Sequence, residues 1–153
     1  MKRRKGHIEV LARGVLVVDG QVLLCHSRGA RNTYLPGGHV EFRESARAAL
    51  RRELEEELGR TATVGRFLGA VEHTFRQKGA RHCEINLVFE MRIRGLRPPR
   101  DPASREPKIA FRWEPLAVLA RSTLEPHPLR CALARWLRAG PMPARWAGTY
   151  DDS

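Results

Sequence analysis

Acidic side chains gather in one short stretch of the chain, at a spacing that suits metal chemistry. Glu53, Glu56 and Glu57 stand at positions i, i+3 and i+4, so an α-helix would project all three carboxylates from one face. Like charges at this spacing repel one another and destabilise a helix. Carboxylate oxygens are the ligands that Mg2+ and Mn2+ prefer, and a bound cation would offset the repulsion. The spacing therefore indicates a divalent-metal site; the alternative is a solvated acidic face balanced by the arginines around it.

A glycine pair precedes this stretch. Pro36, Gly37 and Gly38 stand just before the expected helix. Glycines let the backbone come close to a ligand, and a loop that feeds a helix start can present backbone groups to phosphate oxygens. Taken alone, Pro-Gly-Gly is also explained by an ordinary turn from a strand into a helix.

The glycines and the acids belong to one longer pattern. Residues 38–60 read GHVEFRESARAALRRELEEELGR and resemble the Nudix box, G-x5-E-x7-R-E-U-x-E-E-x-G-U, where U is aliphatic. Every position agrees except the last, where Arg60 replaces the aliphatic residue. The chain therefore resembles the MutT-like Nudix hydrolases, which cleave diphosphate linkages with a divalent metal. Arg60 lies past the metal face, so we expect it to affect packing at most.

The resemblance implies roles for individual residues. It assigns Mg2+ or Mn2+ to Glu53, Glu56 and Glu57, with a backbone carbonyl of the glycine loop, here at Gly37, as a further ligand. Arg52 is expected to pair with one of the glutamates and to hold its rotamer, and Glu44 to act as a structural and electrostatic partner. Together with Arg52, we expect two of the metal ligands, Glu53 and Glu56, to be catalytic residues.

The general base is a separate question, because relatives take it from the box or from a glutamate on a later segment. Glu84 is the favoured candidate, since it stands on the polar face of its strand; Glu72 and Glu106 are alternatives. Some relatives place this glutamate directly before the tryptophan that matches Trp113. Arg112 stands there, so that assignment does not carry over.

Substrate contacts are expected on the approach to the box. Arg28 and Arg31 fall between the second expected strand and the glycine loop, and arginine matches phosphate oxygens bidentately. The backbone of Gly38 is a third candidate contact. Four aromatic residues could stack on a base, although each also suits packing in the core or the tail: Phe75, Trp113, Trp146 and Tyr150.

The element that must carry the acids is a helix over residues 44–58. This segment has no glycine or proline and is dominated by alanine, leucine, arginine and glutamate, which are good helix formers. One apolar residue recurs at every fourth position and forms a stripe that would face a core: Ala46, Leu50, Leu54 and Leu58.

Strand patterns flank this helix. Asp-Gly at residues 19–20 predicts a hairpin between two apolar runs. The expected strands are 8–18, 21–25, 61–75, 81–93 and 109–113; further helices are expected over 115–120 and 129–138, and a proline-rich loop over 95–108. Within 81–93, alternation predicts one core face (Cys83, Ile85, Leu87, Phe89, Met91) and one mostly polar face (Glu84, Asn86, Val88, Glu90, Arg92).

Strands and helices in this order predict an α/β fold with a mixed sheet and helices packed on it. This agrees with the α/β/α sandwich that the Nudix resemblance implies. We expect residues 1–153 to form a single domain with a core over about residues 8–138. The segment 140–153 is rich in proline, glycine and polar residues and is expected to be a flexible tail or to cover a pocket.

The amino-acid composition of the chain limits which binding partners are expected. The chain has 153 residues and a net charge of +11, and 24 of its 28 basic residues are arginine. Such a surface attracts polyanions, but no aromatic residues alternate with the basic ones, as single-strand-binding surfaces require. No apolar run approaches the roughly 20 residues that cross a bilayer, so no membrane partner and a cytoplasmic location are expected. Three scattered cysteines without a C-x2-C pair indicate neither a disulfide framework nor a zinc site.

Three functions follow from these patterns. The leading one is hydrolysis of a small-molecule nucleotide, in which a nucleoside diphosphate is linked to another group such as a phosphate or a sugar. An enzyme acting on the 5′ end of RNA is the second, suggested by the charge. A catalytically silent nucleotide-binding module is the third, and the intact acidic face argues against it. The leaving group and a homodimeric state remain open.

Overall fold

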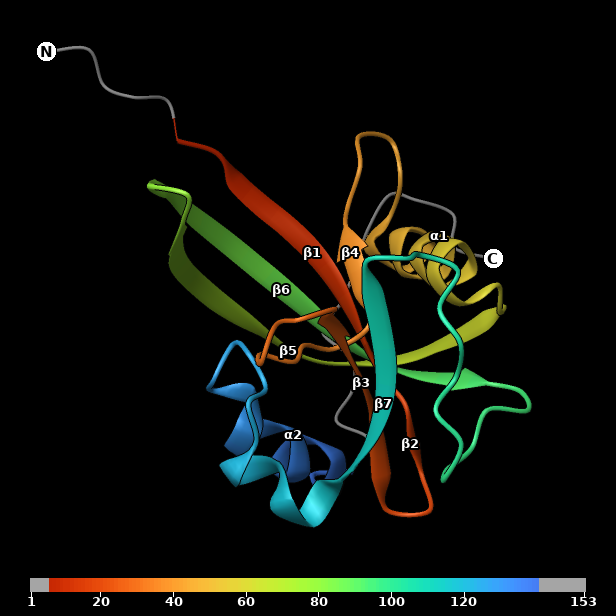
Figure 1. Ribbon diagram of the computed structural model, residues 1–153. Coiled ribbons are helices and arrows are strands. Elements are labelled where there is room, and N and C mark those ends of the chain that lie inside the picture. Colours follow the sequence, from red (N-terminus) through yellow and green to blue (C-terminus); the bar gives the residue numbers. More distant parts are fainter. Residues whose placement is uncertain (1–5, 141–153) are drawn as a thin grey trace, which may run out of the picture.

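The computed structural model describes residues 6–140 (Figure 1). Its elements, in chain order, are β1 (Ile8–Val15), β2 (Val17–Val18), β3 (Gln21–Ser27), β4 (Gly37–His39), α1 (Ala46–Leu58), β5 (Ala62–Gln77), β6 (Ala80–Ile93), β7 (Ile109–Pro115), the 3-10 helix η1 (Leu116–Arg121) and α2 (Leu129–Arg138). The predicted tail therefore lies almost wholly outside the described residues.

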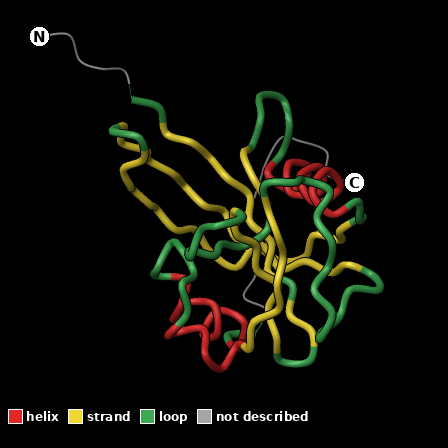
Figure 2. The backbone as a smooth tube through the Cα atoms, viewed as in Figure 1, coloured by secondary structure: helices red, strands yellow, loops and turns green. Residues whose placement is uncertain are grey.

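Two sheets form the centre of the molecule. One has four strands in the order β4-β1-β6-β5, in which β1 and β6 run parallel and the other neighbours antiparallel. The other has three antiparallel strands in the order β2-β3-β7. The two helices lie on opposite sides of these sheets (Figures 1 and 2). The predicted α/β fold, with a mixed sheet between the box helix and a C-terminal helix, is confirmed.

Short turns set the strand registers. Asp19 and Gly20 have φ angles of 50° and 73° and connect Val18 directly to its partner Gln21, as the Asp-Gly pair predicts. A second two-residue turn at 78–79 joins the long strands β5 and β6. The predicted hairpins are therefore both present.

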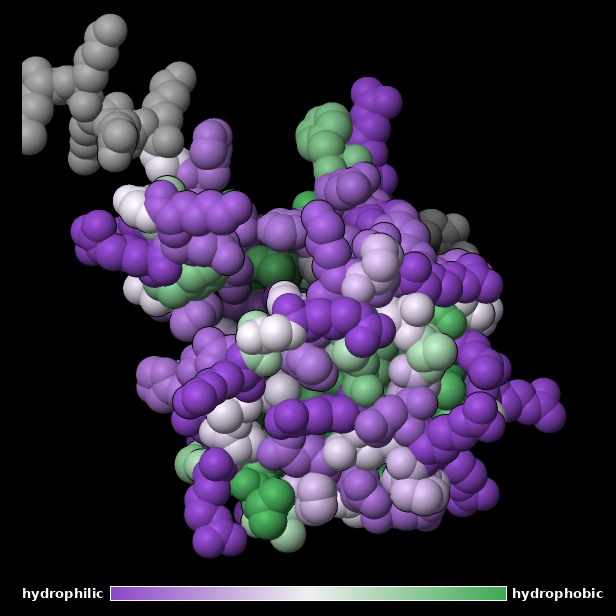
Figure 3. Space-filling model, in the orientation of Figure 1, coloured by the Kyte–Doolittle hydropathy of each residue, from purple (hydrophilic) through white to green (hydrophobic). Residues whose placement is uncertain are grey.

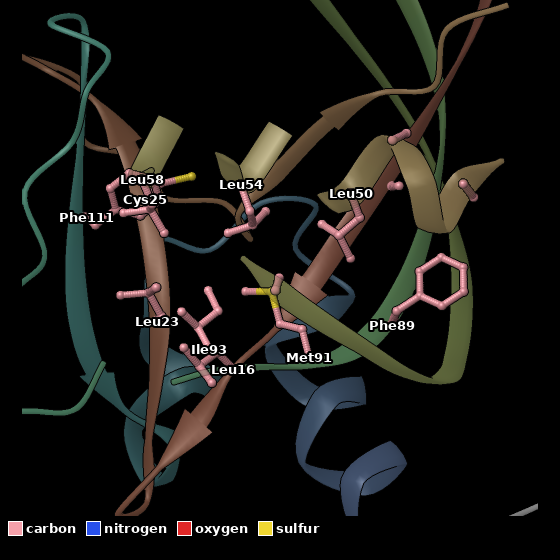
Figure 4. Packing of buried hydrophobic residues seen from close by; sticks show 14 of the residues in the cluster. Leu16, Leu23, Cys25, Leu50, Leu54, Leu58, Phe89, Met91, Ile93 and Phe111 are labelled. Carbon is pink, nitrogen blue, oxygen red and sulfur yellow. The ribbon is translucent and has the colours of Figure 1, made fainter. Parts of the chain in front are cut away.

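Helix α1 begins two residues later than predicted. Ser45 has an extended backbone, and its side-chain oxygen accepts a hydrogen bond from the amide of Ala48 at 3.1 Å, so Ser45 is the N-cap. The helix ends at Gly59, whose φ of 63° suits glycine. The apolar stripe is buried as predicted. Leu50, Leu54 and Leu58 point toward core residues from β3, β6 and β7 and toward Leu16, which lies between β1 and β2 (Figure 4); among these core residues are Leu23, Met91, Ile93 and Phe111.

The interpretation of β6 as a strand with one polar face is wrong. Asn86 and Val88 stand on the face predicted to be polar, and both are fully buried. Val88 lies in a second apolar cluster with Leu133 of α2 and Val71 of β5, and Asn86 is hydrogen-bonded to Arg13 and Glu84. Because β6 is an inner strand with a buried cluster against each face, alternation in its sequence cannot show which side faces solvent.

Beyond β7, the predicted helix after Pro115 is a 3-10 helix, and α2 coincides with the predicted segment 129–138. No helix in residues 6–140 is long and apolar enough to cross a membrane.

Candidate active site

The guanidinium of Arg52 joins the start of the acidic helix to its charged face. Its Nε and Nη2 donate to the two carboxylate oxygens of Glu44 at 3.1 and 2.7 Å. Its Nη1 donates to Glu53 at 3.0 Å and lies 3.4 Å from Glu56, and Nη2 also donates to the carbonyl of His39 at 3.0 Å. Arg52 therefore contacts two box glutamates, while its bidentate partner is Glu44, whose pKa it lowers.

The two glycines make room for this arrangement. A Cβ on Gly38 would collide with the carboxylate of Glu53, so only glycine lets that carboxylate lie over the loop. Gly37 has a φ of 128°, and a Cβ there would collide with the backbone oxygen of Ala12. The carbonyl of Gly37, the predicted metal ligand, accepts a hydrogen bond from Arg13 at 3.1 Å.

Glu57 is the acid with the most unusual surroundings. Its Oε2 is buried and has no hydrogen-bond partner within the described part of the chain. Burial, and next the negative charge of Glu53, raise the pKa of Glu57 to about 7; Glu106 and Glu56 act in the same direction, and Arg13 in the opposite one. A buried carboxylate without a partner is costly, so this site is suited to a cation.

The carboxylate oxygens of the box glutamates therefore suit a hard divalent cation. Their side chains are not yet arranged around one. Within residues 6–140, no three His, Cys, Asp or Glu side chains are already gathered as metal ligands. The reason is visible at Arg52, which holds the carboxylates of Glu53 and Glu56 toward itself. Glu56 is largely exposed and lies 3.4 Å from Arg52, farther than Glu53 does, so its side chain can leave Arg52 and turn toward a cation beside Glu57.

A cavity of about 600 Å³, a size that suits a nucleoside, is connected to the glycine loop through Arg13, which lines the cavity and donates to the carbonyl of Gly37. It is lined by charged, polar and aromatic side chains from β1, β3, β5, β6 and the connecting segments: Arg13, Ser27, Ala30, Asn32, Tyr34, His73, Phe75, Arg76, Gln77, Glu84, Glu125 and Pro126. The predicted base Glu84 is among them.

Arg13 and Asn86 connect the cavity to the glycine loop, and both were missed from the sequence. Arg13 donates from Nε to the side-chain oxygen of Asn86 at 3.2 Å and from Nη1 to the carbonyls of Leu35 and Gly37. Asn86 donates to the carboxylate of Glu84 at 3.3 Å. One signal was available: Arg13 is the only charged residue in the apolar run from residue 10 to residue 18.

Aromatic rings form part of the cavity wall. The rings of His73 and Phe75 stack with centroids 5.2 Å apart, and Phe75 stacks on His82 at 4.9 Å. Elsewhere in the lining, the guanidinium of Arg13 lies 5.4 Å from the ring centre of Tyr34. Flat rings of this kind can receive a nucleobase.

The two arginines predicted to contact phosphate do not line this cavity. Arg28 is exposed and donates from Nε to the carbonyl of Pro107 at 2.9 Å, and neither it nor Arg31 lines the cavity. From the same segment, the cavity receives Asn32 and Tyr34 instead.

The remaining candidates divide by location. Glu72 is exposed and does not line the cavity, whereas Glu106 is close enough to Glu57 to raise its pKa. Trp113 is buried in the core, and its indole nitrogen donates to the carbonyl of Arg100 at 3.0 Å. Trp146 and Tyr150 lie outside the described residues.

Comparison with known proteins identifies the family to which this chain belongs. The family model of the NUDIX domain matches residues 9–136. Because the match covers most of the chain, the chain belongs to the Nudix family of pyrophosphohydrolases, and the resemblance of residues 38–60 to the Nudix box is confirmed.

Individual relatives agree with this assignment. The chain is 45% identical over 67 residues to the CTP pyrophosphohydrolase of Escherichia coli (strain K12); the matched segment covers 41% of this chain and about half, 49%, of that relative. The solution structure of the E. coli ORF135 protein has a TM-score of 0.66 and 26% identity, covering 89% of this chain and 95% of that one. A MutT NUDIX hydrolase from Burkholderia pseudomallei has a TM-score of 0.57 and 28% identity, covering 72% and 85%.

Proposed function

We propose that this chain hydrolyses the diphosphate linkage of a small-molecule nucleotide with Mg2+ or Mn2+ held by Glu53, Glu56 and Glu57. Substrates of this class are nucleoside triphosphates, nucleoside diphosphates and nucleoside diphosphates linked to a sugar. The family membership supports the reaction class. The buried, unpartnered oxygen of Glu57 supports the metal, because a cation would satisfy it.

One observation carries the proposal: Arg13 belongs to both the acidic site and the cavity. Its positive charge lowers the pKa of Glu57, which burial raises, and its side chain lines the 600 Å³ cavity together with Tyr34 and Phe75. A nucleoside in the cavity would therefore direct its phosphate chain past Arg13 toward the glutamates. Arginine pairs well with phosphate oxygens, so Arg13 is the phosphate ligand that we favour over Arg28 and Arg31.

The protein residues divide the work as follows. Arg52 holds Glu53 in place, and Gly38 leaves space for that carboxylate. Asn86 orients Glu84, which is placed in the cavity wall as a candidate to accept a proton from the attacking water. When bound, the divalent cation supplies charge neutralisation for the diphosphate and lowers the pKa of a water.

CTP is the first substrate to test. The relative that matches residues of this chain at 45% identity is described as a CTP pyrophosphohydrolase. The cavity offers both donors and acceptors for a base edge, among them the side-chain amides of Asn32 and Gln77.

A product screen with Mg2+ or Mn2+ tests the proposal. Nucleoside triphosphates, diphosphates and nucleotide sugars are incubated with the full chain, and products are separated by chromatography, which identifies the bond that is cut. We expect metal-dependent turnover that is largely lost in Glu57→Gln and kept in Glu55→Gln, an exposed glutamate of the same helix. Equal turnover in wild type and folded Glu57→Gln would refute the metal assignment, and no turnover on any small molecule would refute the substrate class.

A further inference from the structure

A second pocket lies at the C-terminal end of α1, away from the proposed substrate cavity. It has a volume of about 550 Å³ and is lined by residues from the end of the helix and from the loop that follows β6: Leu58, Arg60, Gly95, Leu96, Arg97, Arg100, Asp101, Pro102, Ala103, Ser104 and Arg105. The backbone of this loop passes near the helix (Figure 2). In the described part of the chain, it shares no lining residue with the 600 Å³ cavity. Hydrophilic side chains project from the side of the molecule where this loop lies (Figure 3).

The lining of this pocket is strongly basic. Among residues 6–140, four arginines line it, and Asp101 is the one acid that does. The carboxylate of Asp101 is engaged inward, because it accepts a hydrogen bond from the amide of Trp113 at 2.9 Å. Arg97 has an exposed ion pair with Asp19 at 3.4 Å, which contributes little to stability.

The other arginine side chains have no comparable pairing. Within residues 6–140, the guanidinium groups of Arg60, Arg100 and Arg105 have no hydrogen-bond or ion-pair partner. Arg105 packs over Gly59 at the helix end, where its charge complements the helix dipole. That explains Arg105 structurally, whereas Arg60 and Arg100 are exposed and their side chains form no ion pair with any residue from 6 to 140.

The loop that presents these arginines is held in place. The amide of Arg105 donates to the carbonyl of Glu57 at 2.7 Å, and the indole of Trp113 donates to the carbonyl of Arg100 at 3.0 Å. Ser104 accepts from the amide of Glu106 at 3.0 Å. A binding site whose backbone is already ordered loses less entropy when its ligand arrives.

We propose that this pocket binds a phosphate-bearing anion at a site separate from the box glutamates, with Arg60 and Arg100 as its principal ligands. Arg60 is the one residue at which the chain departs from the Nudix box. At this position, where the Nudix box has an aliphatic residue, the chain has an arginine. Its positive charge adds to those of the three other arginines that line the pocket. Guanidinium groups bind phosphate oxygens through paired charge-assisted hydrogen bonds, and the pocket has room for a phosphate with an attached sugar.

Phosphate of this kind could come from a free polyphosphate or from the backbone of a single-stranded RNA. Binding of tripolyphosphate and of a short single-stranded oligoribonucleotide is therefore measured separately, by calorimetry and by fluorescence anisotropy. The full chain is used in EDTA, so that no metal recruits phosphate to the box glutamates. The test variant is Arg60→Gln/Arg100→Gln, and the charge-matched control is Arg121→Gln/Arg135→Gln, two exposed arginines on η1 and α2.

We expect the test variant to bind about tenfold more weakly, because each lost charged contact carries a substantial share of the affinity. The slope of log affinity against log salt should fall by about one to two for RNA. Arg60→Lys/Arg100→Lys, which keeps the charge without the bidentate geometry, should lie between wild type and the glutamine variant. A loss confined to tripolyphosphate identifies a free polyphosphate as the ligand, and a loss that includes the oligoribonucleotide identifies an RNA backbone.

Equal weakening in the test and control variants would overturn the proposal, since it would mean attraction by net charge alone. Unchanged binding in the test variant would overturn it as well. Glu57→Gln should bind both ligands as wild type does; a loss of binding there would place the ligand in the catalytic site. The outcome is independent of the proposed hydrolysis, because the measurement uses no metal and no turnover.

Discussion

Arg13 donates from Nε to the side-chain oxygen of Asn86 at 3.2 Å, and Asn86 is fully buried in the middle of the four-stranded sheet. The pair bridges the parallel strands β1 and β6, whose partners are more than 70 residues apart in sequence. Because Arg13 also binds the glycine loop and Asn86 binds Glu84, one contact ties together two parts of the proposed site.

Asn86→Asp tests the role of Glu84 through this contact. The variant keeps an acceptor for Arg13 but replaces the donor to Glu84 with a negative charge, which disfavours the ionised form of Glu84. If Glu84 accepts the proton, the acid limb of the pH–rate profile should move to higher pH, and turnover below neutral pH should fall about tenfold or more.

The matched control is Asn32→Asp, which adds the same charge to the lining of the cavity that contains Glu84. An acid limb that moves equally in both variants would indicate a general effect of charge. An acid limb that does not move in Asn86→Asp would remove Glu84 from the role of base.

Glu57 should make the metal-free protein less stable as pH rises. Folding raises the pKa of this acid from 4.5 to about 7, so the folded state holds the proton more tightly than the unfolded state. The stability associated with the proton is fully present below about pH 4.5 and is lost as pH rises to about 7, by at most about 3 kcal/mol. Glutamine resembles the protonated acid and carries no charge at any pH.

Denaturant unfolding in EDTA checks this expectation. Glu57→Gln should be about as stable as wild type near pH 5 and more stable by about 1–3 kcal/mol near pH 8. Added Mg2+ should stabilise wild type and not the variant. A wild-type protein whose stability in EDTA is the same at both pH values would contradict the buried position of Glu57.

Much of the architecture follows from local sequence. Asp19 and Gly20 form the predicted turn because both adopt positive φ angles, and α1 is predicted by its helix formers, although only the structure identifies Ser45 as its cap. These features depend on residues close together in the chain, so a single sequence contains them.

The lining of the proposed site could not be predicted in the same way. The burial of Val88 depends on the apolar cluster that residues of α2 and β5 form with it, and the contact of Arg13 with Asn86 depends on the parallel pairing of β1 and β6. The spacing along one strand does not specify which distant strand lies beside it. Arg28 shows the same dependence, since its hydrogen bond to the carbonyl of Pro107 joins residues that are 79 positions apart in sequence.

Arg43→Gly should stabilise the protein. Arg43 has a φ of 72° in the loop between β4 and α1, a conformation in which a side chain costs about 1–2 kcal/mol. Glycine removes that cost but adds roughly 0.5–1 kcal/mol of backbone entropy to the unfolded state, so the expected net gain is about 0.5–1 kcal/mol. Arg51→Gly is the control, because glycine inside α1 should lower stability by about 1 kcal/mol. Denaturant unfolding distinguishes the two, and a loss of stability in both would show that Arg43 makes a contact worth more than its strain.

Gly38→Ala should lower turnover without lowering the stability of the fold. The added Cβ would collide with the carboxylate of Glu53, which is the far end of a flexible side chain and can turn away without unfolding the loop. Displacing a proposed metal ligand by about 1 Å should reduce turnover by about tenfold to a hundredfold, while the melting temperature stays close to that of wild type. Gly6→Ala, where a Cβ would meet nothing within 4 Å, is the control for the alanine itself. Wild-type turnover in a folded Gly38→Ala protein would mean that the position of Glu53 over the glycine loop is not required for the reaction.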